Sequence, residues 1–271
     1  MYRYKMTGIV AGVSLALLIG ASTATFAQET ALWNEVQKDG RLRCGAAEDP
    51  PYIIRDTATG DYGGLFVELC REFAAVLKVK PEFVATSWDN MVAGLQAKKW
   101  DIAMSLTATP QRALAVSFSK PVTHTEVTFL YNKQTPKLSD PKSVADIDQT
   151  GINIAVTSGS ANDKYLTDAI KNASIMRLPG TDDIRMAVMS KRADIALDTL
   201  PANDLFLALH PDWATVLRPV PAVNSKPVAF ALRRGTSFAD MQVLDIFIAD
   251  QLATGHIEKL FRDAITLTAK Q

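Results

Sequence analysis

Apolar and polar positions alternate along this chain in a pattern that predicts strands and helices in turn. Between the predicted strands, apolar residues repeat every three or four positions, which is typical of amphipathic helices. The first such repeat comprises Phe66, Leu69, Phe73, Val76 and Leu77. Short apolar runs suited to buried strands lie at 42–46, 83–85, 102–105, 128–131, 152–156, 175–178, 195–197 and 228–232. This alternation predicts an α/β protein with mostly parallel sheets flanked by helices.

The same pattern divides the chain into two parts. A polar stretch with two prolines, QTPKLSDPK at 134–142, follows the run at 128–131, and the alternation then begins again. We interpret this stretch as a crossing into a second lobe. The predicted boundaries place residues 28–131 and 225–271 in lobe 1 and residues 132–224 in lobe 2. The strongly periodic helix near 241–252 is expected to pack back on lobe 1.

Residues 1–27 are predicted to be a secretory signal peptide. Arg3 and Lys5 precede an uncharged apolar stretch, and Thr25-Phe26-Ala27 supplies small residues before a cleavage site. We therefore expect a periplasmic mature protein that begins at Gln28. The alternative is an uncleaved anchor, because the uncharged stretch is nearly long enough to span a bilayer.

Composition narrows the classes of partner and cofactor. The chain carries 29 basic and 29 acidic side chains, so nothing points to nucleic acid or to an anionic membrane surface. The three histidines are scattered, and no phosphate-binding glycine loop or nucleophile elbow occurs, so we expect no cofactor and no metal site. Cys44 and Cys70 form either a disulfide or two buried thiols.

Candidate chemistry is concentrated in the segment 88–121. A helical repeat and a buried strand lead into a loop that carries Ser105, Thr107 and Thr109, and Arg112 follows in the first turn of a new helix capped by Thr109. Ligands of α/β proteins gather at the carboxyl ends of strands. Hydroxyls, free amides and one guanidinium placed there predict a site for a carboxylate.

This segment resembles the family 3 solute-binding proteins, which are the periplasmic amino-acid-binding proteins of ABC transporters. The likeness is carried by Trp88-Asp89, by 95–101, 105–112 and 116–121, and by the C-terminal GHIEKLFRD. The resemblance implies a type II periplasmic binding protein fold with two lobes and two hinge crossings. It also implies a monomer, not an enzyme, that captures an amino acid or similar small carboxylate and delivers it to a membrane ABC permease.

The resemblance also assigns ligand contacts. Arg112 would hold the carboxylate, and the turn at Gly159 and Ser160 would present free amides to it when the lobes close. Hydroxyl or main-chain contacts would come from Ser105 and Thr107. The seven predicted ligand-binding residues are Arg112, Ser105, Thr107, Ser160, Asp198 and two aromatic walls, Tyr52 and Trp88.

Asp198 is the candidate partner for an α-ammonium group on the ligand. The family places this aspartate five residues after a first one, whereas Asp198 lies four residues after Asp194 and Thr199 takes the family's position. A shift of one residue turns a strand side chain to the other face. Asp198 still reaches the cleft if the strand ends there; otherwise the ligand need not carry an amine.

Two other functions fit the sequence less well. Some relatives resemble cyclohexadienyl dehydratases, which act on prephenate-like acids and need a general acid in the cleft, for which Glu48 is the candidate. Others partner periplasmic quinoprotein dehydrogenases, although a ligand-competent site at Arg112 argues against that role.

Overall fold

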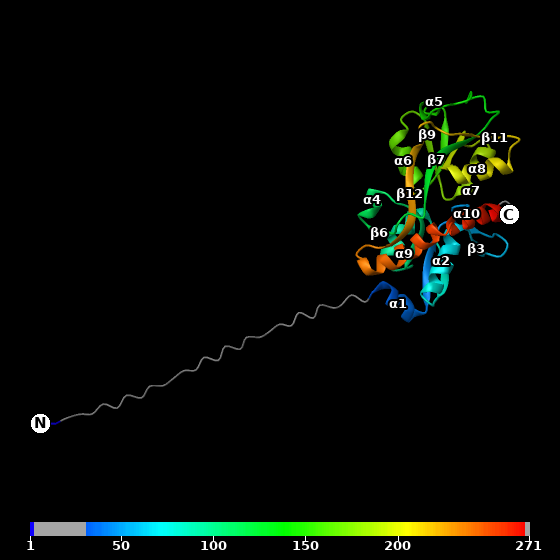
Figure 1. The fold of residues 1–271 in the computed structure, drawn as a ribbon. Coiled ribbons are helices and arrows are strands. Elements are labelled where there is room, and N and C mark those ends of the chain that lie inside the picture. Colours follow the sequence, from blue (N-terminus) through cyan, green and yellow to red (C-terminus); the bar gives the residue numbers. More distant parts are fainter. Residues whose placement is uncertain (3–30, 269–271) are drawn as a thin grey trace. The chain divides into compact units, whose positions relative to one another are not determined.

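The computed structural model describes residues 1–2 and 31–268, and helices and strands alternate through it as the pattern predicts (Figure 1). The elements up to the middle of the chain are α1 (Leu32–Asp39), β1 (Arg41–Ala46), β2 (Ile54–Arg55), β3 (Tyr62–Gly63), α2 (Leu65–Val76), β4 (Lys80–Ala85), α3 (Trp88–Gln96), β5 (Ile102–Thr107), α4 (Pro110–Ala113), β6 (Val116–Phe118) and β7 (Thr123–Asn132). The remainder are α5 (Val144–Ile147), β8 (Asn153–Thr157), α6 (Ala161–Ala169), β9 (Ser174–Leu178), α7 (Thr181–Met189), β10 (Ile195–Thr199), α8 (Leu200–Leu209), β11 (Ala214–Leu217), β12 (Val223–Arg233), α9 (Phe238–Ala253) and α10 (His256–Thr268).

Two sets of parallel strands are joined through a pair of long antiparallel strands. The order of pairing is β4-β1-β5-β12-β7-β10-β8-β9, with β6 on β12 and β11 on β7. Strand β1 is parallel to β4 and β5, and β8 is parallel to β9 and β10. Strands β7 and β12 are antiparallel to each other and to their other neighbours, and they connect the two parallel sets (Figure 1). The predicted two-lobe α/β fold with two crossings is therefore confirmed.

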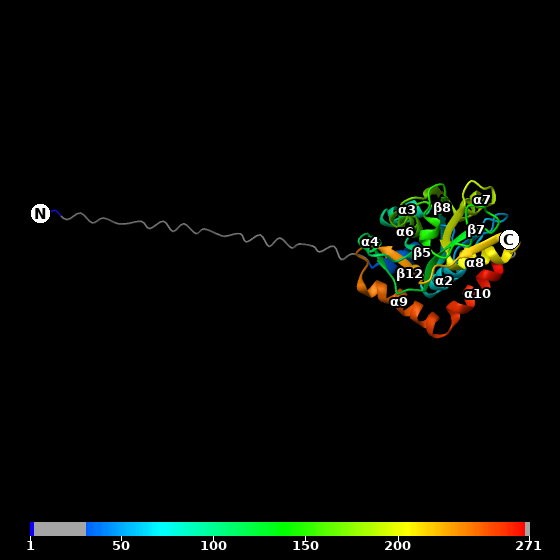
Figure 2. The ribbon, with the colours of Figure 1, turned by 90° about the horizontal axis from the view of Figure 1, so that it is seen from above.

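Each lobe has its own hydrophobic core. The first-lobe core gathers side chains of β1, α2, β5 and β12, such as Leu42, Phe73 and Phe230. Helix α9 adds Leu244 and Phe247, so the prediction that the last strongly periodic helix returns to lobe 1 is confirmed. Figure 2 shows α9 and α10 along one flank of this lobe, where α10 packs against α2 and α9.

The second-lobe core lies on both faces of the strands around β10. One face buries Phe129, Ile154 and Leu197 beneath α6, and the other buries Ala196 together with residues of α7 and α8. Because Phe129 lies in β7, the second-lobe core already begins within that strand. We therefore propose that the first crossing lies before Phe129 and not after residue 131 as the sequence alone suggested.

The hinge is the short stretch in which β7 and β12 pass from one core to the other. Along β7 this stretch separates Val122, which directly precedes the strand and packs in the first core, from Val127, which packs in the second. In β12 the pairing register with β7 shifts between Val223 and Lys226, and Asn224 takes a left-handed backbone with φ +49°. A shift of this kind interrupts the hydrogen-bonded ladder and is a natural place for a strand to bend.

Cys44 and Cys70 form a disulfide that ties β1 to α2, so the sequence alternative of two free thiols is not what the structure contains. Except for residues 1–2, the predicted signal peptide and its cleavage site lie outside the described residues. None of the helices within residues 31–268 is long and apolar enough to cross a membrane.

Candidate functional site

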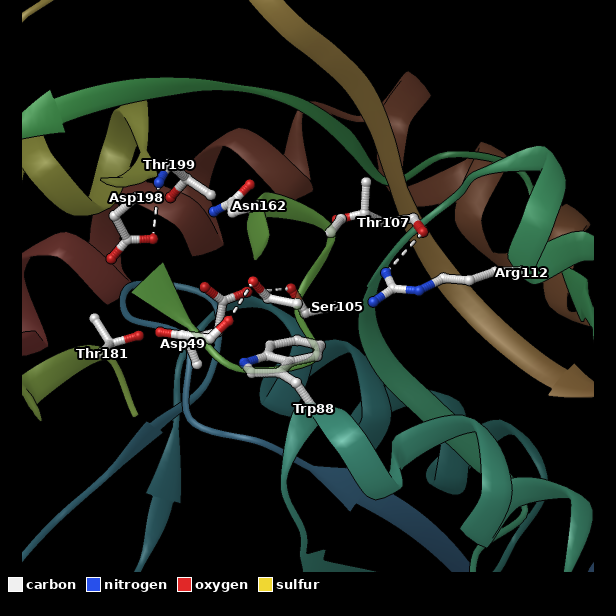
Figure 3. Close-up of a pocket in the computed structure, with 12 residues that line it drawn as sticks. Asp49, Trp88, Ser105, Thr107, Arg112, Asn162, Thr181, Asp198 and Thr199 are labelled. Carbon is white, nitrogen blue, oxygen red and sulfur yellow. Dashed lines mark hydrogen bonds between the residues drawn. The ribbon is translucent and has the colours of Figure 1, made fainter. Parts of the chain in front are cut away.

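A pocket lies between the two lobes, and six of the seven predicted ligand-binding residues line it (Figure 3). The lining residues are Asp49, Trp88, Ser105, Thr107, Arg112, Thr157, Ser160, Ala161, Asn162, Thr181, Asp198 and Thr199. The first five belong to the first lobe and the others to the second. Several come from the carboxyl ends of β5, β8 and β10, which is where ligands gather in parallel α/β sheets.

The end of β5 is shaped to aim Ser105 into the pocket. Opposite Ala229 and Ala231 of β12, strand β5 carries an extra residue, and Ser105 adopts φ +52°. A bulge re-aims side chains, and strained backbone of this kind gathers at functional sites. The Ser105 hydroxyl donates a hydrogen bond of 2.7 Å to the carboxylate of Asp49.

Arg112 occupies the position that the sequence predicts. The Thr109 hydroxyl caps α4 by accepting the Arg112 N–H at 3.2 Å. The guanidinium donates to the Thr107 carbonyl at 3.1 Å and, across the cleft, to the Gly159 carbonyl at 3.3 Å. Burial lowers the pKa of Arg112 to about 10, so the group stays charged at neutral pH. Within residues 31–268 it has no carboxylate partner, and a ligand carboxylate is the natural one.

The turn before α6 lies on the second-lobe side of the cleft. Several of its hydrogen-bonding groups already have partners within the same lobe. The Ser160 hydroxyl donates to the Thr157 carbonyl at 2.7 Å and accepts the Asp163 N–H at 3.1 Å. The Gly159 N–H donates to the Asp163 carboxylate at 3.2 Å, so it is not the free amide that the sequence suggested. The first helical residues, Ala161 and Asn162, line the pocket, and N–H groups at this position have no partner within a helix.

The two lobes approach each other closely at Gly159. Its φ of +68° is left-handed, and a Cβ placed on it would meet Asp89, including the backbone Cα of Asp89 at 2.9 Å. Asp89 belongs to α3 of the first lobe. The absence of a side chain at Gly159 is therefore a condition for the closed arrangement of the cleft.

Gly159→Ala is expected to weaken ligand affinity by about tenfold or more, because the methyl group opposes closure as well as straining the left-handed backbone. Isothermal titration with any bound ligand measures this effect. Gly151→Ala is the matched control, because Gly151 also has positive φ, +90°, but nothing lies within 4 Å of an added Cβ. An equal loss of affinity in both variants would mean that strain alone, and not closure, is responsible.

Tyr52 does not lie where the sequence analysis placed it. Its side chain is 1% exposed and packs in the first-lobe core, with ring centroids 6.0 Å from Phe66 and 5.8 Å from Phe261. Phe66, the first residue of the predicted helical repeat, is fully buried in the same core. The chain after β1 turns inward, so the aromatic ring is used for packing and does not form a wall of the pocket. Trp88 at the start of α3 does line the pocket.

Asp49 is the functional candidate that the sequence analysis missed. Its neighbour Glu48 was the nominated acid, but Glu48 is exposed and does not line the pocket. Burial raises the pKa of Asp49 to about 7, and nearby Asp198 adds to the rise, whereas the Ser105 hydrogen bond and Arg185 oppose it. The sequence signal was an acidic pair directly after the first strand; only the structure distinguishes its two members.

Asp198 reaches the pocket because β10 ends beside it, but it already has a cation near it. A guanidinium nitrogen of Arg185 lies 3.6 Å from Asp198 Oδ2, and the two side chains are 10% and 9% exposed. Asp198 Oδ1 accepts the Thr199 N–H at 2.8 Å. Among the described residues, Asp198 Oδ2 and Thr199 Oγ1 are buried without a hydrogen-bond partner. Burial raises the pKa of Asp198, and Arg185 acts against that rise.

The pocket therefore combines an unpaired guanidinium on one side with buried carboxyl and hydroxyl groups on the other, between lobes that two strands connect. Figure 3 shows Arg112 and Asp198 at opposite sides of the view, with Asp49 and Ser105 between them. This arrangement defines a two-lobed protein that encloses a small polar solute.

The chain belongs to the bacterial extracellular solute-binding proteins, family 3, whose model matches residues 42–262. It is 28% identical to the cyclohexadienyl dehydratase of Pseudomonas aeruginosa over 244 residues, which cover 88% of this chain and 87% of the relative. It is 27% identical to the L-cystine-binding protein TcyJ of Escherichia coli, covering 95% of this chain and 93% of the relative.

A solved structure of an ancestral amino-acid-binding protein, AncCDT-1, described as a precursor of cyclohexadienyl dehydratase, also matches this chain. It superposes with a TM-score of 0.79 at 27% identity and covers 87% of this chain and 100% of its own. The type II periplasmic binding protein fold expected from the resemblance is confirmed.

Proposed function

We propose that this solute-binding protein is periplasmic and binds an amino acid or similar small acid between its lobes. It then delivers the solute to a membrane ABC permease. The observation that carries the proposal is Arg112, a partly buried arginine whose guanidinium bonds only to carbonyl oxygens of Thr107 and Gly159 within the described chain. A carboxylate can accept two parallel hydrogen bonds from such a group.

Binding in this scheme needs no covalent step. The ligand would meet groups of both lobes, so its binding free energy favours the arrangement in which the lobes are together. Relatives with an amino-acid-binding name, such as the L-cystine-binding protein TcyJ, support this class of ligand. The predicted contacts of Ser105, Thr107, Ser160 and Trp88 remain proposals, and each of these residues lines the pocket.

A thermal-shift screen of amino acids and carboxylic acids tests the proposal. A ligand present at one hundred times its Kd stabilises the folded state by about 2.7 kcal/mol. For a domain of this size that corresponds to roughly 5–10 °C in melting temperature. We expect at least one small acid to give such a shift. If none of them shifts the melting temperature, the pocket does not bind this class of ligand.

One observation favours a second candidate, an enzyme acting on a cyclohexadienyl acid. Asp49 is a partly buried carboxyl whose pKa is raised to about 7 by loss of solvation, so it is suited to donate a proton, and one relative is named cyclohexadienyl dehydratase. Incubation with prephenate, followed by ultraviolet absorbance of the aromatic product, separates the candidates. We expect binding of small acids without turnover. Product formation that disappears in Asp49→Asn would establish the enzyme instead.

A further inference from the structure

We propose that Asp49, and not Asp198, is the residue that selects a ligand with an amine, by pairing its carboxylate with the ligand ammonium. The inference rests on the proposed function, because it takes a carboxylate held by Arg112 as its starting point. It makes the first lobe the source of both charged contacts, since Arg112 and Asp49 both belong to it.

The negative charge of Asp198 is already balanced by the positive charge of Arg185. Arg185 lies 3.6 Å from its carboxylate, donates to the Ala202 carbonyl at 3.2 Å and lies over the ring of Phe206 at 5.2 Å. These contacts fix the guanidinium in place. A ligand ammonium beside Asp198 would therefore share the carboxylate with a buried cation and be repelled by it.

Asp49, by contrast, has no cationic side chain paired with it in the described chain. Its carboxylate accepts the Ser105 hydroxyl at 2.7 Å, and no cation of the described chain forms a salt bridge with it. Its backbone is held firmly, because the Asp49 N–H donates to the Ile53 carbonyl at 2.8 Å and its carbonyl accepts the Tyr52 N–H at 2.7 Å. A fixed carboxyl group facing a polar pocket needs either a proton or a cation.

The net charge of the pocket also favours pairing of Asp49 with a ligand ammonium. The charged groups that line the pocket or are buried beside it are Arg112, Arg185, Asp198 and, when ionised, Asp49. Asp182 also lies 3.5 Å from Arg185, but its side chain is 77% exposed, so solvent screens its charge. A zwitterion leaves this set neutral, with its carboxylate at Arg112 and its ammonium at Asp49. An acid without an amine adds one negative charge, which is balanced when Asp49 takes up a proton. The two ligand classes thus require opposite protonation states of the same side chain.

The affinities for amino acids and for amine-free acids should therefore depend on pH in opposite directions. The groups that face Asp49 are Ser105, Asp198, Arg185 and the Tyr52 hydroxyl. In the ligand-free pocket the pKa of Asp49 is about 7. Below that pH, binding of an ammonium must displace the proton, so affinity for an amino acid falls by about tenfold per pH unit and by about 100-fold at pH 5. An amine-free acid loses affinity instead as the pH rises above 7.

The test is calorimetric titration with matched ligand pairs, between pH 5 and 8 for the amino acids and between pH 6 and 8 for the amine-free acids, whose carboxylates take up protons near pH 5. We would use L-leucine with 4-methylpentanoate and L-arginine with 5-guanidinopentanoate, plus any amino acid found in the screen with its amine-free analogue. Repeating each titration in buffers of different ionisation enthalpy counts the protons released. We expect proton release with the amino acid and proton uptake with the analogue.

Two isosteric variants complete the test. Asp49→Asn is expected to bind the amino acid at least tenfold more weakly at pH 8 and to lose the pH dependence. Asp198→Asn is the matched control, because it also removes one buried carboxylate from the pocket but should keep the pH slope. Retention of the slope in Asp49→Asn, or its loss in Asp198→Asn alone, would overturn the proposal.

Other outcomes distinguish a failure of this inference from a failure of the proposed function. If amine-free acids bind as tightly as amino acids at every pH, and Arg112→Ala abolishes both, the proposed function stands and the role of Asp49 is wrong. If no carboxylate binds the wild-type protein, both are wrong. If Asp49→Asn fails to fold, the test rests on the wild-type protein. Amino-acid binding without proton release would then contradict the proposal.

Discussion

Arg112→Ala is expected to abolish ligand binding while leaving the fold intact. The guanidinium is partly buried, charged and without a carboxylate partner in the described chain, so the ligand carboxylate would be its counter-charge. Removing one member of such a buried pair costs about 2–5 kcal/mol, which is more than thirtyfold in affinity. Calorimetry on the folded variant measures the loss.

Two controls make the result specific. Arg41→Ala removes a half-exposed arginine that pairs with Glu82 on the surface, and it should leave affinity unchanged. Arg112→Lys keeps the charge but loses the parallel donors, so it should bind with intermediate affinity. Near-native affinity in Arg112→Ala would remove the basis of the carboxylate site.

Replacement of both cysteines by alanine is expected to lower the free energy of unfolding by about 3–4 kcal/mol. The disulfide closes a loop with a sequence separation of 26 between β1 and α2, and loop closure of this length restricts the unfolded chain by about that amount. Urea denaturation of the wild-type protein and the Cys44→Ala/Cys70→Ala variant measures the difference. Affinity should change little, because neither cysteine lines the pocket.

Reduction provides the matched control for the cysteine variant. A reducing agent should lower the stability of the wild-type protein by a similar amount and leave the double variant unchanged. If the double variant is as stable as the oxidised wild type, the cross-link contributes nothing to the fold.

Much of the fold could be predicted from the sequence pattern because the central strands are buried on both faces, which gives continuous apolar runs, whereas the helices bury one face. The runs at 42–46, 102–105 and 195–197 all lie within strands of the structure, and Pro110 with Thr109 begins α4 as expected. Short strands such as β2 and β3 were missed, because two residues carry no periodic signal. Leu252 fits the helical repeat but is 39% exposed, because it lies near the end of α9.

The site was less predictable because it depends on partners from distant elements. The segment from Ser105 to Arg112 could be located, since its residues are close in sequence, although Ser105 and Thr107 belong to the end of β5 and not to a loop as expected. The pairing of Asp198 with Arg185 could not, because it depends on how α7 packs beside β10. The choice between Glu48 and Asp49 depends on the direction in which a loop turns, and no local pattern encodes that direction.

The break in pairing between Val223 and Lys226 allows the ligand specificity of the pocket to change independently of the stability of the fold. Because both cores lie outside the hinge, the lobes can part without repacking either core, and only contacts across the cleft are lost. One such contact is the hydrogen bond from the charged Arg112 guanidinium to the Gly159 carbonyl, and bonds of this kind contribute about 1.5–3 kcal/mol. Substitutions at the cleft surface can therefore alter which solute is held without drawing on the stability of the fold. A scaffold of this kind tolerates changes in specificity, and its range of ligands can diversify by single substitutions.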